Sequence, residues 1–145
     1  MKIREILKNK GPQVFSIGEE LTASEAIRLL ALNSIGVLIV LSAESKIVGI
    51  LSERDIIRQC YSNPDMFQRK QIKDIMTKKV IFAEPNDEIE YLESLMTQNK
   101  IRHVPILDNG VLVGLISLGD IVNALLTGSR VENKYLMDYI SGNIA

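Results

Sequence analysis

The chain has 145 residues, which suits one compact domain or two very small ones. Its 46% hydrophobic and 24% charged residues are typical of a globular protein, and a net charge of −1 without a basic block argues against a nucleic-acid partner. One cysteine and one histidine exclude a disulfide framework and a histidine-based zinc site within one chain. The start lacks a secretory signal and the longest apolar stretch, 35–41, is too short for a bilayer, so we expect a cytoplasmic location.

The first half of the chain predicts the order β-α-β-β-α. A short strand is expected at 14–17 and a helix at 22–33, which "TASE" opens with Thr22 as the cap. Two strands follow at 36–41 and 47–52, and their nearly continuous apolar residues indicate burial on both faces. A second helix is expected at 54–62, and Cys60 is expected in the core because it lies on the apolar side of this helix.

The second half of the chain predicts the same order after a polar segment that contains a proline. A strand is expected at 80–83, and a helix from about residue 87 has its apolar residues at helical spacing. Strands at 103–107 and 112–117 are joined by "DNG", which is a strong hairpin signal. A last helix of this half is expected at 120–127.

The two halves are copies of one repeat. Val14 matches Val80 at an offset of 66 residues, and four further matches follow at an offset of 65. These four are Gly49 with Gly114, Ser52 with Ser117, Asp55 with Asp120, and Ile56 with Ile121. A repeat of about 60 residues buries a poor core alone, so we expect the two repeats to pack about a pseudo-twofold axis.

The expected domain organisation follows from the repeat. Residues 1–62 form the first repeat with a lead-in helix, 63–71 form a linker, and 72–128 form the second repeat. A further amphipathic helix at about 131–141 falls within the C-terminal segment 129–145 and has no place in the repeat.

Each repeat carries Ser-x-x-Asp where a strand gives way to a helix, and two explanations are open. As a capping box, Ser52 or Ser117 caps the helix and the aspartate three residues later favours its N-terminus. As a binding site, the carboxylate of Asp55 or Asp120 accepts the two hydroxyls of a ribose, while the serine and nearby amides suit a phosphate. The two roles can coexist.

The repeats resemble a known family in several motifs. Each ends in "G-h-h-S-x-x-D-h", where h is apolar, and this tandem pattern resembles a pair of CBS domains, named after cystathionine β-synthase. "RHVPIL" at 102–107 and "DIMTKKV" at 74–80 also resemble segments of that family. The resemblance runs from about residue 3 to about residue 127. It implies an α/β fold of two β-α-β-β-α repeats with flanking helical segments.

The resemblance also implies a function. A CBS pair has clefts between its repeats that bind adenosine-type ligands such as AMP, ADP, ATP, NAD-type or S-adenosyl compounds, and two pairs usually form a flat homodimer. Such stand-alone modules usually regulate an enzyme, channel or transporter. We therefore expect a regulatory nucleotide, with AMP favoured, and an unidentified regulated protein. The alternative is a dimeric scaffold that binds no ligand.

The resemblance assigns residues to this site by type. Ser52, Asp55, Ser117 and Asp120 are expected at ribose or phosphate, and Arg102 and His103 at phosphate. The base and the cleft walls are expected to involve Ser16, Ile17, Gly36, Val37, Phe82 and Pro105. Simpler explanations remain open: a solvated Arg102, a His103 bonded to backbone, and a Phe82 in the core.

An enzyme or a resident metal is not expected. A triad of Ser117, His103 and Asp120 lacks the G-x-S-x-G elbow that presents a nucleophilic serine. The carboxylates are scattered rather than clustered, so Mg²⁺ would arrive with ATP.

The two copies differ where a phosphate would bind. Gly36 and Val37 stand where the second repeat has Arg102 and His103, so the first repeat offers no positive charge there. Glu53 would also repel a phosphate unless Arg54 offsets it. We therefore expect nucleotide to bind better at Ser117 and Asp120 than at Ser52 and Asp55.

Overall fold

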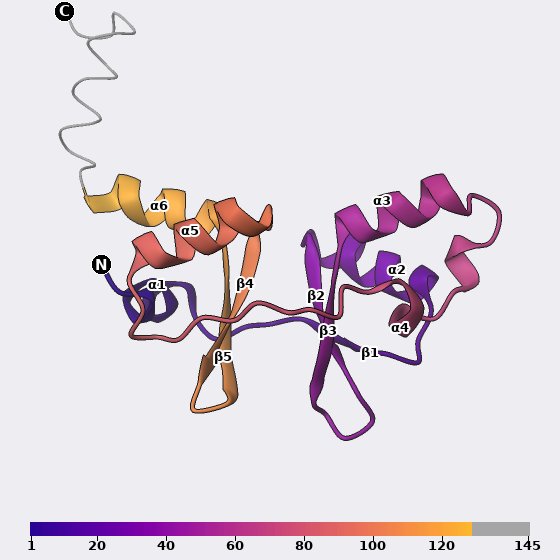
Figure 1. The fold of residues 1–145 in the computed structure, drawn as a ribbon, viewed down its shortest axis with the longest axis horizontal. Helices are drawn as coiled ribbons and strands as arrows, with labels where there is room; N and C mark the ends of the chain where they lie inside the picture. The colour runs from indigo at the N-terminus through magenta and orange to yellow at the C-terminus, as the bar shows by residue number, and fades with distance from the viewer. Residues whose placement is uncertain (129–145) are drawn as a thin grey trace, which may run out of the picture. The chain divides into compact units, whose positions relative to one another are not determined.

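The computed structural model describes residues 1–128, which form two compact units (Figure 1). The first-repeat unit is Gln13–Ile81, and the second-repeat unit combines Met1–Pro12 with residues 82–128. The helix expected at 131–141 lies outside the described residues. The fold is α/β, as predicted.

The first-repeat unit has the predicted β-α-β-β-α order followed by two short helices. Its sheet has the order β1-β2-β3, with β1 parallel to β2 and β2 antiparallel to β3. The elements are β1 (Ser16–Gly18), α2 (Ala23–Asn33), β2 (Val37–Leu41), β3 (Ile47–Ser52), α3 (Glu53–Ser62), the 3-10 helix η1 (Phe67–Arg69) and α4 (Ile72–Ile75).

Helix α2 and strand β2 supply many of the buried residues in the core of this unit. The side chain of Thr22 accepts a hydrogen bond from the amide of Glu25, which confirms the predicted cap. Leu38 of β2 belongs to the buried cluster that includes α2. Its neighbour Ile39 is also fully buried, and successive strand residues point to opposite faces. The predicted burial of both faces is therefore confirmed for β2.

The second-repeat unit contains a two-stranded antiparallel sheet and three helices. Its elements are α1 (Ile3–Lys10), α5 (Ile89–Asn99), β4 (His103–Asp108), β5 (Val111–Ser117) and α6 (Leu118–Gly128). Asn109 and Gly110 connect the strands with φ of 51° and 80°. Positive φ at both central residues is what a type I′ hairpin turn needs, so the prediction from "DNG" is confirmed.

The strand predicted at 80–83 is wrong, and Pro105 supplies a physical reason. In the first-repeat unit the amide of Ile39 donates to the carbonyl oxygen of Phe15 at 3.0 Å, next to the β1–β2 ladder. Pro105 occupies the equivalent place in β4 and has no amide hydrogen to donate. The pairing is thereby reduced to one parallel bridge, between Ala83 and Ile106.

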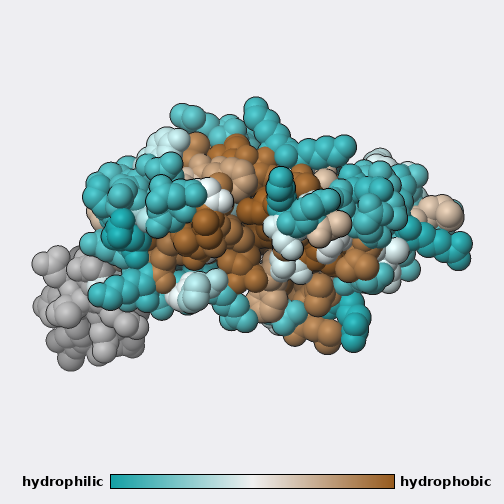
Figure 2. Space-filling model, turned by 90° about the horizontal axis from the view of Figure 1, so that it is seen from below, coloured by the Kyte–Doolittle hydropathy of each residue, from teal (hydrophilic) through white to brown (hydrophobic). Residues whose placement is uncertain are grey.

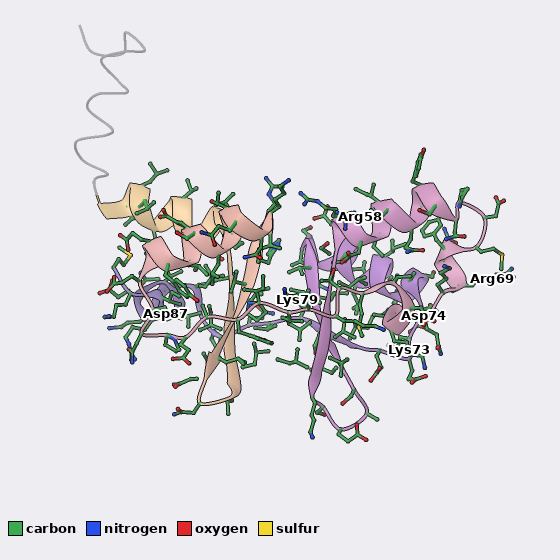
Figure 3. The ribbon with its side chains drawn as sticks, viewed as in Figure 1. Arg58, Arg69, Lys73, Asp74, Lys79 and Asp87 are labelled. Atoms are coloured by element: carbon green, nitrogen blue, oxygen red, sulfur yellow. The ribbon has the colours of Figure 1, made fainter. Side chains whose placement is uncertain are left out.

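The lead-in segments complete the cores of these units. Helix α1 precedes the first repeat in sequence but buries Ile3 and Ile6 in the second-repeat unit, where Leu7 lies against Gly114. Asp87, labelled in Figure 3, helps to anchor α1 because its carbonyl oxygen accepts from the amide of Ile3 at 3.0 Å.

Helix α4 has the equivalent role in the first-repeat unit. It buries Ile72 and Ile75 there, and Met76, the residue after it, lies against Gly49. Lys73, labelled in Figure 3, forms an ion pair with Glu20 at 3.2 Å. Residues that precede one repeat or link the two are thus integral to a compact unit.

Helices α3 and α6 expose apolar side chains at matching positions. Ile57 and Tyr61 are 66% and 90% exposed, and their counterparts 65 residues later, Val122 and Leu126, are 48% and 53% exposed. Cys60 is exposed as well, so the expectation that it lies in the core is wrong. The apolar residues of α3 do not all face one core, and helical periodicity alone could not reveal this. Figure 2 shows brown hydrophobic surface bordered by teal hydrophilic surface on the face in view.

Candidate functional site

Each unit has a junction where the second hairpin strand passes into a helix. At both junctions the first helical amide donates to the residue that begins the hairpin: Glu53 to the carbonyl oxygen of Gly36 at 3.0 Å, and Leu118 to that of Arg102 at 2.8 Å. This bond holds the helix start against the beginning of the hairpin. The sequence features predicted to act together are therefore neighbours within each unit.

At the first junction, Asp55 is buried and its carboxylate is occupied by neighbours. Its Oδ2 accepts from the amide of Ser52 at 2.9 Å and from the hydroxyl of Ser52 at 3.1 Å, while the amide of Asp55 donates back to that hydroxyl at 3.3 Å. Its Oδ1 accepts from the hydroxyl of Thr77 at 3.1 Å. The capping-box explanation is thus confirmed here, with an added tie to Thr77.

At the second junction, Asp120 forms the same reciprocal pair and also an ion pair. Its Oδ2 accepts from the amide of Ser117 at 2.8 Å, and its amide donates to the hydroxyl of Ser117 at 3.1 Å. Lys10 at the end of α1 donates from Nζ to Oδ2 at 2.6 Å and to the carbonyl oxygen of Leu115 at 2.6 Å. All the hydrogen bonds just described on this carboxylate fall on one of its two oxygens.

The ion pair with Lys10 helps to lower the pKa of the Asp120 carboxyl. Partial burial by itself raises the pKa of the Asp120 carboxyl, because it removes water from the charged form. The hydrogen bonds from Lys10 and Ser117, with the charge of Lys10, outweigh burial, and the pKa lies below its ordinary value. Asp120 is therefore ionised at neutral pH and acts as an acceptor.

A hollow of about 560 Å³ opens beside the second junction, within the size range of small-molecule sites. Its wall combines the basic pair at the start of β4 with the first turns of α6. Apolar side chains of α6 complete it. The lining residues are Arg102, His103, Ser117, Leu118, Gly119, Val122, Asn123 and Leu126. Ser117 thus belongs both to the wall of the hollow and to the pair with Asp120.

The structure sorts the predicted site residues into two groups, one in each unit. Ser16, Ile17, Gly36, Val37, Ser52 and Asp55 lie in the first-repeat unit. Phe82, Arg102, His103, Pro105, Ser117 and Asp120 lie in the second-repeat unit.

Burial separates these residues further. Ile17 and Val37 are 5% and 4% exposed, so their side chains are packed in the unit. Pro105 is buried, Phe82 is half-buried, and Ser16 and Arg102 are exposed. His103 is half-buried and pairs with Ser117 across the β4–β5 ladder. The predicted residues whose side chains are at least partly exposed are Ser16 and Ser52 in one unit, and Phe82, Arg102, His103, Ser117 and Asp120 in the other.

Sequence reasoning missed two contacts with the aspartates, those of Thr77 with Asp55 and of Lys10 with Asp120. Thr77 lies in "DIMTKKV", so the motif was visible although the role of its threonine was not. Nothing in the sequence distinguishes Lys10 from other surface lysines. Both contacts arise because lead-in residues distant in sequence pack against a strand-to-helix junction.

Residues 1–128 contain neither a candidate metal cluster nor a helix that could span a membrane. No group of three or more histidine, cysteine, aspartate or glutamate side chains is placed to hold a metal ion in this part of the chain. Among its helices, none is both long and apolar enough to reach across a bilayer.

Comparison with known proteins gives one consistent family. The family model described as CBS domain matches residues 3–62 and residues 72–127. The chain is similar to "CBS domain-containing protein CBSX3, mitochondrial" of Arabidopsis thaliana, with 28% identity over 97% of this chain and 72% of that protein. It is also similar to the crystal structure of a CBS-domain-containing protein from Agrobacterium tumefaciens, with 32% identity, a TM-score of 0.83, and coverage of 85% and 92%.

A third similarity concerns a structure with bound ligands. The CBS domain pair of protein MJ0100, in complex with 5′-methylthioadenosine and S-adenosyl-L-methionine, has 25% identity to this chain and a TM-score of 0.75. The match covers 86% of this chain and 99% of that one. The chain and this ligand complex therefore share a fold along nearly their whole lengths.

Proposed function

The chain belongs to the CBS-domain family, as a tandem pair of CBS domains, and from this premise we propose that it is a regulatory module for an adenosine-type nucleotide. The nucleotide binds at the β5–α6 junction of the second repeat. Asp120 accepts the ribose hydroxyls, while Arg102, His103 and Ser117 face the phosphate. The proposal contains no catalytic step.

The observation that carries this proposal is that hydrogen-bond donors and an ionised acceptor lie together at one junction. Arg102, His103 and Ser117 line one hollow, and Ser117 is bonded to the ionised carboxylate of Asp120. A ribose phosphate needs both an acceptor for its vicinal hydroxyls and donors for its anionic oxygens. Residues from β4, β5 and α6 supply these groups within one unit.

The first junction supports the proposed preference for the second repeat. Asp55 is 8% exposed and accepts hydrogen bonds on both of its carboxylate oxygens from Ser52 and Thr77. A ribose would have to displace these internal donors. Gly36, at the position of Arg102, brings no charge to compensate.

Both ligands in the similar MJ0100 structure contain adenosine, which supports an adenosine compound as the ligand of this chain. We favour AMP within this class because Arg102 is a planar cation suited to phosphate. ATP and NAD-type compounds carry the same adenosine phosphate and stand as the alternatives.

Signalling is proposed to pass through a homodimer. The exposed apolar residues Ile57 and Tyr61 on α3, and Val122 and Leu126 on α6, recur at the same repeat positions. A second copy of the chain would cover such surface, which a monomer leaves in water. Because Val122 and Leu126 also line the hollow, a bound nucleotide would alter the surface that α6 presents. A regulated partner would sense this difference only if the ligand favours one of two arrangements.

Thermal melting tests this function in the full chain. AMP at 100 times its Kd should stabilise the fold by about 2.7 kcal/mol. The shift should disappear in Asp120→Asn and persist in Asp55→Asn, which is the matched change in the other repeat. Absence of a shift with AMP, ATP and NADH would contradict nucleotide binding.

One observation favours a second candidate, a dimeric scaffold without a ligand. Both aspartates already have partners within the chain, as helix caps and through Thr77 and Lys10. On this alternative the exposed apolar residues of α3 and α6 still form a dimer interface. Ultracentrifugation would then detect a dimer whose stability and association do not respond to any adenosine compound.

A further inference from the structure

Lys10, the last residue of α1, ends against the carboxylate at the second junction. Its Nζ lies 2.6 Å from Oδ2 of Asp120 and 2.6 Å from the carbonyl oxygen of Leu115. The two charged side chains are 32% and 24% exposed, so the pair is accessible from solvent without being loose on the surface. Lys10 is thus positioned where the proposed ribose would bind.

Packing of α1 fixes the position of this cation. Ile3 and Ile6 are buried in the core of the second-repeat unit, and Leu7 lies against Gly114 of β5. The amide of Arg4 donates to the carbonyl oxygen of Pro85 at 2.9 Å. The helix therefore delivers Lys10 to β5 from a buried support. A lysine held by only its own flexible side chain would lack this preorganisation.

The ammonium group retains capacity for a ligand. A lysine has three donors, and the contacts with Asp120 and Leu115 use two of them. A ribose bonded to Asp120 would therefore place its attached phosphate near a charged donor. The cation also offsets the carboxylate, which would otherwise repel that phosphate.

Among the contacts described within residues 1–128, the lead-in segment reaches the aspartate of the first junction through a neutral group. There the donor to Asp55 from the lead-in segment is the neutral hydroxyl of Thr77. The two repeats therefore differ in the group that contacts the carboxylate, a lysine in one and a threonine in the other, as well as at Arg102. The lysine comes from the lead-in helix, whereas Arg102 comes from the hairpin.

We propose that Lys10 is a specificity-determining residue that makes the second-repeat site prefer phosphorylated adenosine ligands over uncharged adenosine. The inference rests on the proposed function and deepens it. The competing explanation is that Lys10 only ties α1 to α6. In that case its removal would weaken the fold without changing which ligand is preferred.

The experiment compares AMP and adenosine by calorimetric titration of the full chain. Lys10→Gln should weaken AMP binding roughly tenfold, since a hydrogen bond from a charged donor contributes about that much, and change adenosine binding by less than about twofold. Lys8→Gln removes an equal charge from an exposed position of the same helix and should leave both affinities unchanged. Lys10→Arg keeps the charge and should keep the preference for AMP.

The outcomes distinguish failure of the proposed role of Lys10 from failure of the proposed nucleotide binding. If the unaltered chain binds neither compound, the proposed function fails and the role of Lys10 fails with it. If AMP binds but Lys10→Gln weakens AMP and adenosine equally, or neither, the function stands and the role of Lys10 is overturned. Circular dichroism of each variant checks that the fold is retained, and Lys10→Arg provides a folded comparison.

Discussion

The starts of α3 and α6 use the same Ser-x-x-Asp sequence in different ways. Asp55 is buried and accepts from Ser52 and Thr77 on both carboxylate oxygens. Asp120 is more exposed, and Ser117 and Lys10 both bind one of its oxygens. The first aspartate is therefore buried and hydrogen-bonded within its unit, whereas the second is partly exposed to solvent. The shared Ser-x-x-Asp motif forms the same helix cap in both repeats. The residues packed around each aspartate determine how far its carboxylate is exposed.

Removal of each carboxylate should give the largest difference between the repeats. Asp55→Ala leaves the half-buried backbone amide of Ser52 and the Thr77 hydroxyl without their acceptor and should cost about 3 kcal/mol of unfolding free energy. Asp120→Ala loses the capping-box partner of Ser117 and the ion pair with Lys10 at a more exposed helix start, and should cost about 1 kcal/mol. Urea denaturation measures both. Equal losses of unfolding free energy would show that the two junctions contribute equally to stability, contrary to this comparison.

The glycines that receive the lead-in segments offer the next comparison. A Cβ at Gly49 would lie 2.9 Å from the carbonyl oxygen of Thr77, which is backbone and cannot swing aside. At Gly114 the obstacle is the tip of the Leu7 side chain, which can change rotamer. Gly49→Ala should therefore cost about 2–3 kcal/mol and Gly114→Ala about 1 kcal/mol, measured by urea denaturation. The reverse order would contradict the packing described for α4 and α1.

The ion pair predicts a difference in acid response between Lys10→Gln and the unaltered chain. The folded pKa of Asp120 is lowered, so its ionised form contributes stability above its ordinary pKa, and this is lost as pH falls through the folded pKa. Lys10→Gln should raise the pKa of Asp120 and reduce that acid-dependent loss. NMR titration of the Asp120 carboxyl measures the shift directly. An unchanged pKa would mean that Lys10 does not pair with Asp120 in solution.

Pro105 gives the smallest expected change in stability. Pro105→Ile restores an amide like that of Ile39, which donates to Phe15 in the other repeat. The gain of about 1 kcal/mol from a new hydrogen bond is offset by a more flexible unfolded chain, so stability should change little. Hydrogen exchange should instead show a protected amide at residue 105. Rapid exchange there would indicate that proline is not what limits strand pairing in the second repeat.

The repeat made most of the fold predictable. Matching residues such as Gly49 and Gly114 fixed the order of elements twice, and "DNG" predicted the turn at Asn109 and Gly110. The strand at 80–83 was the exception, because the missing amide of Pro105 acts on a partner distant in sequence. Cys60 was assigned to a core because periodicity identifies an apolar face without identifying what covers it.

The candidate site was predictable in part, for a similar reason. Ser117 and Asp120 are predictable from the repeated Ser-x-x-Asp motif, and Arg102 from its place in "RHVPIL", which resembles a segment of CBS domains. The contact of Lys10 with Asp120 could not be predicted, because it spans 110 residues of sequence. Local patterns report caps and turns, whereas this contact depends on which unit a lead-in helix joins.

The most direct test of the central claim is the stoichiometry of AMP binding, measured by calorimetric titration of the full chain. The difference between the two junctions predicts one AMP per chain, with binding abolished by Asp120→Asn and retained in Asp55→Asn. Two equivalent sites per chain, or binding that survives Asp120→Asn, would contradict the assignment of the nucleotide to the second repeat.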